Sequence, residues 1–238
     1  MRRVLATLGT ASLLLAAGCG LQSYEKRIDL TLEKMKYEER LNRMLMPADT
    51  SGKWQEMNIY LRAPKDMAAA KEFLLPPTEP GKFDLEKSFF DQSKQQSLHV
   101  LARTKKAKAA AGKKKAATPA DTADRSNFSR DVITVLTTAF SPPDEVTNAM
   151  FKPETKKNNE FKQATLTLPD KVIKTYLYKK EPYDVALIFE IPTAEVSNLT
   201  GKMNLSLESF ATGKKAENAL KGNTSEDEAV GPVGGVAF

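Results

Sequence analysis

Residues 185–191 limit the fold of this chain more than any other stretch. They read VALIFEI, and Glu190 is the only charged residue among them. A strand of this composition presents apolar side chains on both faces, so it belongs in the middle of a sheet that is covered on both sides. Residues 171–178, rich in β-branched and aromatic side chains, form the preceding strand. The turn at 179–184, with Pro182, is short enough to join antiparallel neighbours.

Alternation of apolar and polar residues indicates further strands. In residues 161–168, Ala164, Leu166 and Leu168 lie on one side and threonines on the other, which is typical of a half-buried strand. Three more extended segments are expected at 53–62, 88–90 and 98–103. The only tryptophan, Trp54, precedes the first alternation and is expected in the core.

Helices are indicated by a longer period. Phe128, Val132, Val135, Leu136 and Phe140 follow the spacing of a helix with one buried face, which ends before Pro142-Pro143. A short helix is expected from Asp66 through Leu75. Residues 205–211 fit either a strand or a helix closed by Gly213, and we favour the helix.

Residues 22–46 form a long N-terminal helix, which ends at Pro47. Its apolar positions Ile28, Leu32, Met35, Leu41 and Leu45 are irregularly spaced. It is either a stalk or coiled-coil strand within segment 19–47, or a helix folded onto its own domain.

The expected fold class is α+β, a largely antiparallel sheet with packed helices preceded by the long N-terminal helix. A single domain covers residues 53–212. Residues 104–125 interrupt it with six lysines among alanines and no large apolar side chain. That insertion and the glycine-rich tail 213–238 are expected to be disordered, because neither can bury enough surface to offset its ordering entropy.

The first residues resemble an export signal. Arg2 and Arg3 precede an apolar stretch too short to span a bilayer, and small residues follow. Residues 15–19, Leu-Ala-Ala-Gly-Cys, resemble the lipobox of bacterial lipoproteins, with Ala16 where leucine is usual. The resemblance implies that residues 1–18 are a signal peptide and that Cys19 carries an S-diacylglycerol and an acylated amine.

The lipid would hold the mature chain on a membrane, since two or more acyl chains make desorption negligible. Cys19 is the only cysteine in 238 residues, so it has no disulfide partner within the chain. Gly20 follows it where an aspartate would retain the protein at the inner membrane. This favours the periplasmic face of the outer membrane.

The remaining composition excludes several kinds of chemistry. Without the signal the net charge falls from +6 to +4, because Arg2 and Arg3 are the only charged residues removed. Such mild charge does not imply nucleic acid. His99 is the only histidine, so histidine–cysteine zinc clusters and two-histidine catalysis are excluded. No glycine-rich phosphate cradle occurs. We therefore expect no catalytic residue, metal or cofactor.

The element order from Met57 to Phe210 also resembles the PsbP-like α/β/α sandwich, a resemblance without a motif. It implies a non-enzymatic domain for binding or assembly support. The leading hypothesis is a lipid-anchored binding or accessory subunit of an envelope complex. The alternatives are an envelope hydrolase that uses paired carboxylates, such as Glu181 with Asp184 or Glu190 with Glu195, and a structural lipoprotein whose lysine-rich loop contacts wall or membrane.

Overall fold

A seven-stranded antiparallel sheet organises the domain, as described by a computed structural model that covers residues 24–105 and 127–221. The strand order is β2-β3-β4-β8-β7-β6-β5. The strands are β2 (Ala68–Ala69), β3 (Leu85–Asp91), β4 (Gln96–Thr104), β5 (Lys152–Lys156), β6 (Asn159–Thr167), β7 (Lys171–Lys180) and β8 (Tyr183–Pro192). The antiparallel sheet and its packed helices confirm the α+β fold class.

Strand β8 lies at the centre of this sheet, as its sequence predicts. It pairs with β4 on one side and with β7 on the other. Val185, Leu187 and Phe189 point to one face, Ala186 and Ile188 point to the other, and all five are fully buried. Both rows of apolar side chains are therefore removed from water, which is the main source of stability for such a strand.

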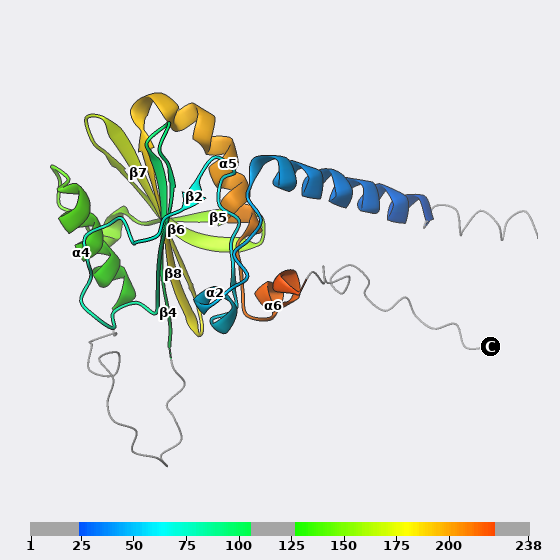
Figure 1. The fold of residues 1–238 in the computed structure, drawn as a ribbon, viewed down its shortest axis with the longest axis horizontal. Coiled ribbons are helices and arrows are strands. Elements are labelled where there is room, and N and C mark those ends of the chain that lie inside the picture. The colour runs from blue at the N-terminus through cyan, green and yellow to red at the C-terminus, as the bar shows by residue number, and fades with distance from the viewer. Residues whose placement is uncertain (1–23, 106–126, 222–238) are drawn as a thin grey trace, which may run out of the picture. The chain divides into compact units, whose positions relative to one another are not determined.

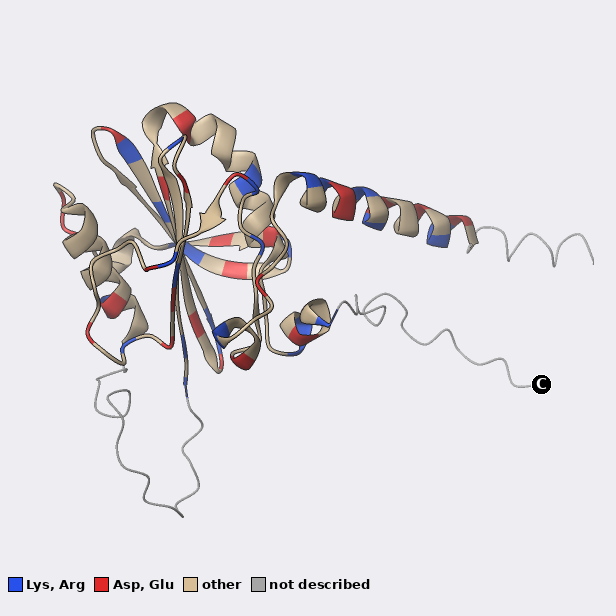
Figure 2. Ribbon diagram, viewed as in Figure 1, with Lys and Arg blue, Asp and Glu red and all other residues tan. Residues whose placement is uncertain are grey.

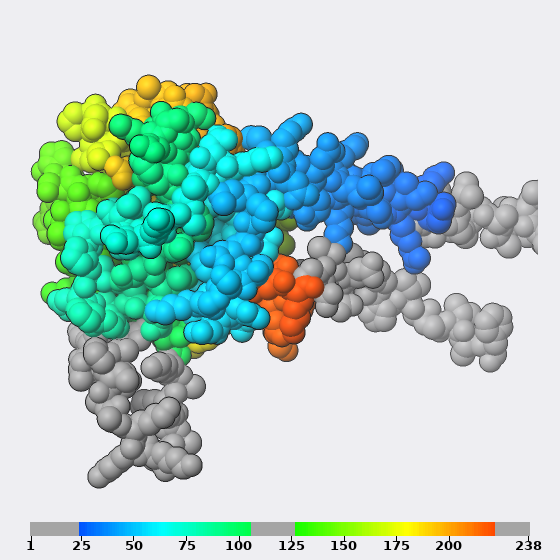
Figure 3. Space-filling model, viewed as in Figure 1, coloured from blue at the N-terminus to red at the C-terminus, as the bar shows by residue number. Residues whose placement is uncertain are grey.

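One face of the sheet is covered by α5 (Val196–Ser209) and α2 (Lys53–Glu56), together with β1 (Ile59–Tyr60) and β9 (Ala211–Thr212), which pair with each other. Leu199, Met203 and Leu207 recur every fourth residue along α5 and pack into this core. The Ser206 hydroxyl donates to the carbonyl of Arg62 at 2.6 Å, tying α5 to the segment after β1. Figure 3 shows the space-filling surface of the domain, with the cyan segments that precede β3 on the side that faces the viewer.

The other face is covered by α4 (Phe128–Phe140), which lies across the sheet from α5 (Figure 1). The Asn127 side chain accepts a hydrogen bond from the Arg130 amide at 3.2 Å and caps the helix. Phe128, Val132 and Leu136 face the sheet and are fully buried. The helix ends at Ser141, whose φ of 42° is left-handed and stops the helical pattern. The helix predicted over 127–140 is thereby confirmed.

Two segments differ from the sequence predictions. The strand expected over 53–62 is only β1, because residues 53–56 form α2 and Asn58 adopts a positive φ of 48°. Met57, Ile59 and Leu61 are nevertheless buried, as the alternation predicted, and so is Trp54. The helix expected over 66–75 is wrong: Ala68 and Ala69 pair with the edge of β3 instead. An available sheet edge here overrides the helix propensity of the alanines.

The C-terminal part also differs. The helix favoured for 205–211 is confirmed, but it begins at Val196 and ends at Ser209, before Gly213. The tail expected to be disordered from Gly213 starts with the short helix α6 (Lys214–Leu220). Two 3₁₀ turns, η1 (Asn148–Met150) and η2 (Thr193–Glu195), complete the domain. The predicted insertion 104–125 and tail 213–238 lie mostly outside the described residues.

The chain divides into two compact units after Arg43. The described part of the first, residues 24–43, is helical throughout and the helix ends at residue 44, which agrees with the predicted N-terminal helix. Its apolar positions differ in exposure: Ile28, Leu32 and Met35 are exposed, whereas Leu41 is buried. The second unit begins at Met44, and the next residue, Leu45, bridges to Pro64 and is buried.

The central position of β8 leads to the first prediction. Replacing Phe189 by alanine leaves a cavity in the sheet core, where its ring packs edge-on against Tyr176 with centroids 6.1 Å apart. We expect a loss of about 3–5 kcal/mol in the free energy of unfolding, measured by urea denaturation. The control Thr167→Ala, at an exposed site on β6, should lose at most about 1 kcal/mol. Equal losses would contradict the central placement.

Candidate functional site

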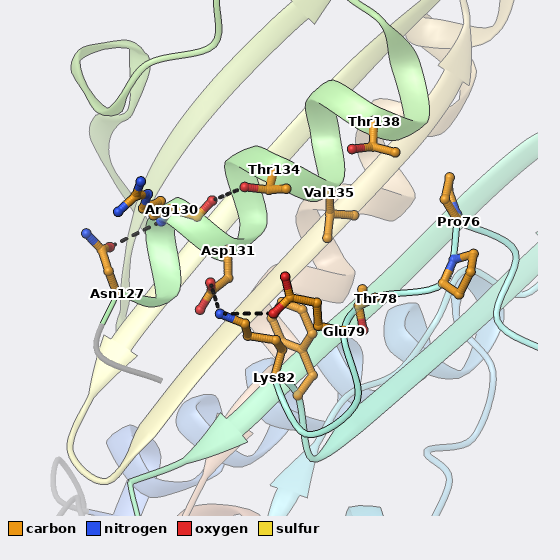
Figure 4. Close-up of a pocket in the computed structure, with 12 residues that line it drawn as sticks. Pro76, Thr78, Glu79, Lys82, Asn127, Arg130, Asp131, Thr134, Val135 and Thr138 are labelled. Carbon is orange, nitrogen blue, oxygen red and sulfur yellow. Dashed lines mark hydrogen bonds and ion pairs between the residues drawn. The ribbon is translucent and has the colours of Figure 1, made fainter. Parts of the chain in front are cut away.

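A groove of about 340 Å³ runs along α4. One wall is a flank of the helix, and the other is the proline-containing loop that leads into β3 (Figure 4). Its lining residues are Pro76, Pro77, Thr78, Glu79, Lys82, Phe83, Asn127, Arg130, Asp131, Thr134, Val135 and Thr138. A volume of this size lies within the range of small-ligand and peptide-side-chain sites.

The floor of the groove is apolar and its rim is polar. Val135 and Phe83 are buried, and the Phe83 ring packs edge-on against Phe128 with centroids 5.9 Å apart. Thr134 and Thr138 are one helical turn apart, and both are exposed on the groove side of α4. An apolar floor with a hydroxyl-bearing rim suits a ligand that buries carbon and keeps its polar groups near water.

The two carboxylates that line the groove are each paired with a cation. The Lys82 ammonium lies 3.3 Å from Asp131 and 3.6 Å from Glu79, and these contacts are drawn in Figure 4. Asp131 also accepts a hydrogen bond from the Arg103 guanidinium at 2.7 Å. Each of the two groove carboxylates therefore has a cation within 4 Å. This arrangement holds the groove in shape and suits binding better than proton transfer.

Arg103 anchors this network from beneath α4. Its side chain is 2% exposed and lies between Asp131 on the helix and Asp184 on β8, 3.4 Å away. The guanidinium also stacks over the Phe128 ring at 5.0 Å. A buried arginine is tolerated only where its donors meet carboxylates. Here one helix and one neighbouring strand supply those partners.

A second polar cluster lies on the same face of the sheet. Ser88 Oγ is 2.9 Å from Nδ1 of His99, and Nε2 of His99 is 3.5 Å from Glu190. Glu190 is also 2.8 Å from the Lys171 ammonium. Serine, histidine and a carboxylate in successive contact are the residue types of a hydrolase triad, so the cluster has the composition of a catalytic site.

Burial gives the cluster a structural role. Ser88 and His99 are 0% and 1% exposed, whereas a nucleophilic serine must reach its substrate. The Ser88 hydroxyl accepts the amide hydrogen of Leu74 at 3.0 Å, and the Phe73 ring packs edge-on against His99. The cluster thus fastens residues 73–74 to the sheet. These residues lead directly into the loop that forms one wall of the groove.

Glu190 is held ionised in this setting. Burial alone would raise its pKa, but hydrogen bonds and charge from His99 and Lys171 outweigh burial and hold the pKa below 4.5. Lys171 in turn lies over the Phe140 ring at the end of α4. The carboxylate therefore links β8, β4 and β7 under the helix.

Lysines gather at the opposite end of β7 and β8. A hollow of about 680 Å³ is lined there by Lys179, Lys180, Lys214 and Lys215, among other residues. Burial lowers the pKa of Lys179, and the positive charges of Lys162, Arg103 and Lys105 lower it further against the opposing effect of Asp184. Lys105, the first lysine of the predicted insertion, joins this end by a hydrogen bond from its amide to Pro182.

The residues named from sequence are only partly brought together. Cys19 and the signal 1–18 lie outside the described residues. Asp184 pairs with Arg103, while Glu181 pairs with Lys105 in solvent. Glu195 accepts hydrogen bonds from Gln96 and Asn198, away from the Glu190 cluster. Neither suggested carboxylate pair is thus arranged as two facing acids.

The groove residues were missed by sequence reasoning because they come from segments far apart in the chain. One signal was present: His99, Leu101 and Arg103 alternate on one strand face, which places both polar residues under α4.

In the described parts of the chain, no group of three His, Cys, Asp or Glu residues could hold a metal ion. Across residues 24–105 and 127–221, no helix is long and apolar enough to cross a membrane.

Searches of known protein families and of curated proteins give no match. Among solved structures, the chain is similar to cyanobacterial PsbP (CyanoP) of Synechocystis sp. PCC 6803, with 10% identity and a TM-score of 0.43 over 71% of this chain and 93% of that one. It is also similar to a protein of Bacteroides thetaiotaomicron VPI-5482, with 7% identity and a TM-score of 0.39 over 66% of this chain. The match covers 46% of the Bacteroides protein. At these scores neither similarity carries an argument about function.

The Glu190 cluster predicts a pH dependence of stability. A carboxylate whose pKa is lower folded than unfolded stabilises the fold above its unfolded pKa, near 4.5, and loses that contribution as pH falls through the folded value. Glu190→Gln should therefore be less stable than the wild type near neutral pH. Its free energy of unfolding should fall less than that of the wild type on acidification below pH 4.5. Chemical denaturation across this range measures it, with exposed Glu160→Gln as control. Parallel pH profiles for wild type and Glu190→Gln would contradict this assignment.

Proposed function

We propose that this protein is a lipid-anchored lipoprotein of the cell envelope, held at the periplasmic face of the outer membrane by acyl chains on Cys19. Its domain is a non-enzymatic binding or accessory subunit, and the groove along α4 is its binding surface. The lipobox-like leader supports the anchoring, and the groove along α4 is the observation that supports the binding role.

Three properties of the groove support binding. It is open along a helix flank, its floor is apolar through Phe83 and Val135, and its carboxylates are already paired with Lys82 and Arg103. A partner that enters it meets fixed shape and hydroxyl groups rather than a reactive side chain. We expect the partner to be another envelope protein that inserts an apolar segment between α4 and the loop. No nucleic acid and no cofactor is part of the proposal.

The anchor is tested at Cys19. Cys19→Ser removes the sulfur that would receive the diacylglycerol, so the precursor should remain uncleaved and incorporate no labelled fatty acid. Cell fractionation should then show loss of the processed, outer-membrane form. Because Cys19 is the only cysteine, no other thiol can take the lipid. Continued acylation of the serine variant would overturn the assignment.

The groove is tested by filling it. Thr138→Arg places a long charged side chain over the floor, whereas Thr137→Arg places the same side chain on an exposed position of α4 outside the groove. In affinity purification from detergent-solubilised membranes, Thr138→Arg should recover at least about tenfold less partner, equivalent to 1.4 kcal/mol of binding. Thr137→Arg should match the wild type. Equal recovery by both variants, or wild-type purifications that return this protein alone, would refute the groove as a binding surface.

A further inference from the structure

The N-terminal helix carries nearly all of the exposed large apolar side chains of the described chain. Six such side chains are exposed in the described residues, and five of them lie on the helix: Tyr24, Ile28, Leu30, Leu32 and Met35. Tyr24 and Met35 are 64% and 62% exposed. Soluble domains rarely leave such a cluster uncovered, and a contiguous one marks a contact surface.

Four of the five form a continuous stripe. Tyr24, Ile28, Leu32 and Met35 are separated by four, four and three residues, which places them within about 80° of one another around the helix axis. Leu30 lies on roughly the opposite side. Figure 3 shows the helix, in blue, with its side chains projecting. We call Tyr24, Ile28, Leu32 and Met35 the apolar stripe.

The charges around the apolar stripe suit a lipid surface. Between residues 24 and 36 there are four basic side chains, Lys26, Arg27, Lys34 and Lys36, against three acidic ones. Both signs recur along the helix in Figure 2. A helix with one apolar face and a charged remainder lies in the plane of a membrane interface with the apolar face turned down.

The short distance from Cys19 to the apolar stripe indicates that a membrane, and not a second copy of the chain, covers the stripe. Four residues lie between Cys19 and Tyr24 in sequence, so the five residue-to-residue steps can span at most about 17 Å. A lipid on Cys19 therefore holds the start of the helix at the membrane surface. The apolar stripe occupies the part of the helix nearest that point and ends at Met35, beyond which Glu38 and Glu39 follow.

We propose that the apolar stripe lies on the membrane that holds Cys19 and forms a second lipid contact beside the acyl chains. The inference rests on the anchoring proposed above. A second copy of the chain is a poorer occupant, since the apolar stripe spans fewer than two heptads and a coiled coil needs three or four. Thr31 and Glu38 would also fall at its core positions.

The test uses the full lipidated protein in vesicles of equal parts phosphatidylethanolamine and phosphatidylglycerol. Acylation would consume the only native thiol, so a cysteine placed in the helix becomes a unique site for an environment-sensitive fluorophore. Leu32→Cys probes the apolar stripe. Leu30→Cys, two residues away on the opposite side and similarly exposed, is the matched control.

We expect brominated acyl chains to quench the fluorophore at position 32 severalfold more than at position 30, with a blue-shifted emission at 32. Equal or absent quenching in acylated protein would overturn the membrane contact and leave the anchor standing. If the labelled Leu32→Cys protein shows no quenching and the unlabelled protein forms disulfide-linked dimers, the membrane contact would be overturned in favour of a second copy. Failure of both variants to incorporate labelled fatty acid would instead overturn the anchoring on which the inference rests.

Discussion

Burial of β8 on both faces is the constraint on which the rest of the domain depends. A strand with apolar side chains in both directions is stable only if a layer covers each face, so α5 and α4 must lie on opposite sides of the sheet. The chain supplies α4 before the last strands and α5 directly after β8. Each helix contributes buried residues at helical spacing, such as Leu199, Met203 and Leu207 on α5.

The layer under α4 is the less usual one, because it holds polar groups inside an apolar face. Arg103 and Asp184 lie under one end of the helix, and His99 and Glu190 lie further along the same face. Burying such groups costs free energy unless each finds a partner. The partners come from the helix and from the strands beside it. These contacts hold α4 and the loop before β3 on the same face of the sheet, so the groove between them has a fixed shape.

Much of the sheet was predictable because its signals are local. The alternation of Ala164, Leu166 and Leu168 and the doubly apolar β8 depend only on period, and the structure confirms both. The failures occurred where tertiary contacts compete with propensity. Ala68 and Ala69 favour a helix by composition but pair with β3, and Asn58 breaks the strand expected around it. The groove could not be predicted, since Phe83 and Val135 are brought together only by packing.

The sequence by itself determined the fold class, the central strand, the helix α4 and the expectation of a lipid at Cys19, because each depends on residues close together in the chain. Only the tertiary structure decided which polar residues share a face, which loop lies beside α4, and which apolar side chains of the N-terminal helix stay exposed. The physical reason is that burial and pairing are set by neighbours in space. Arg103 on β4 and Asp131 on α4 are partners because α4 packs on the sheet, which brings residues 28 positions apart within 2.7 Å.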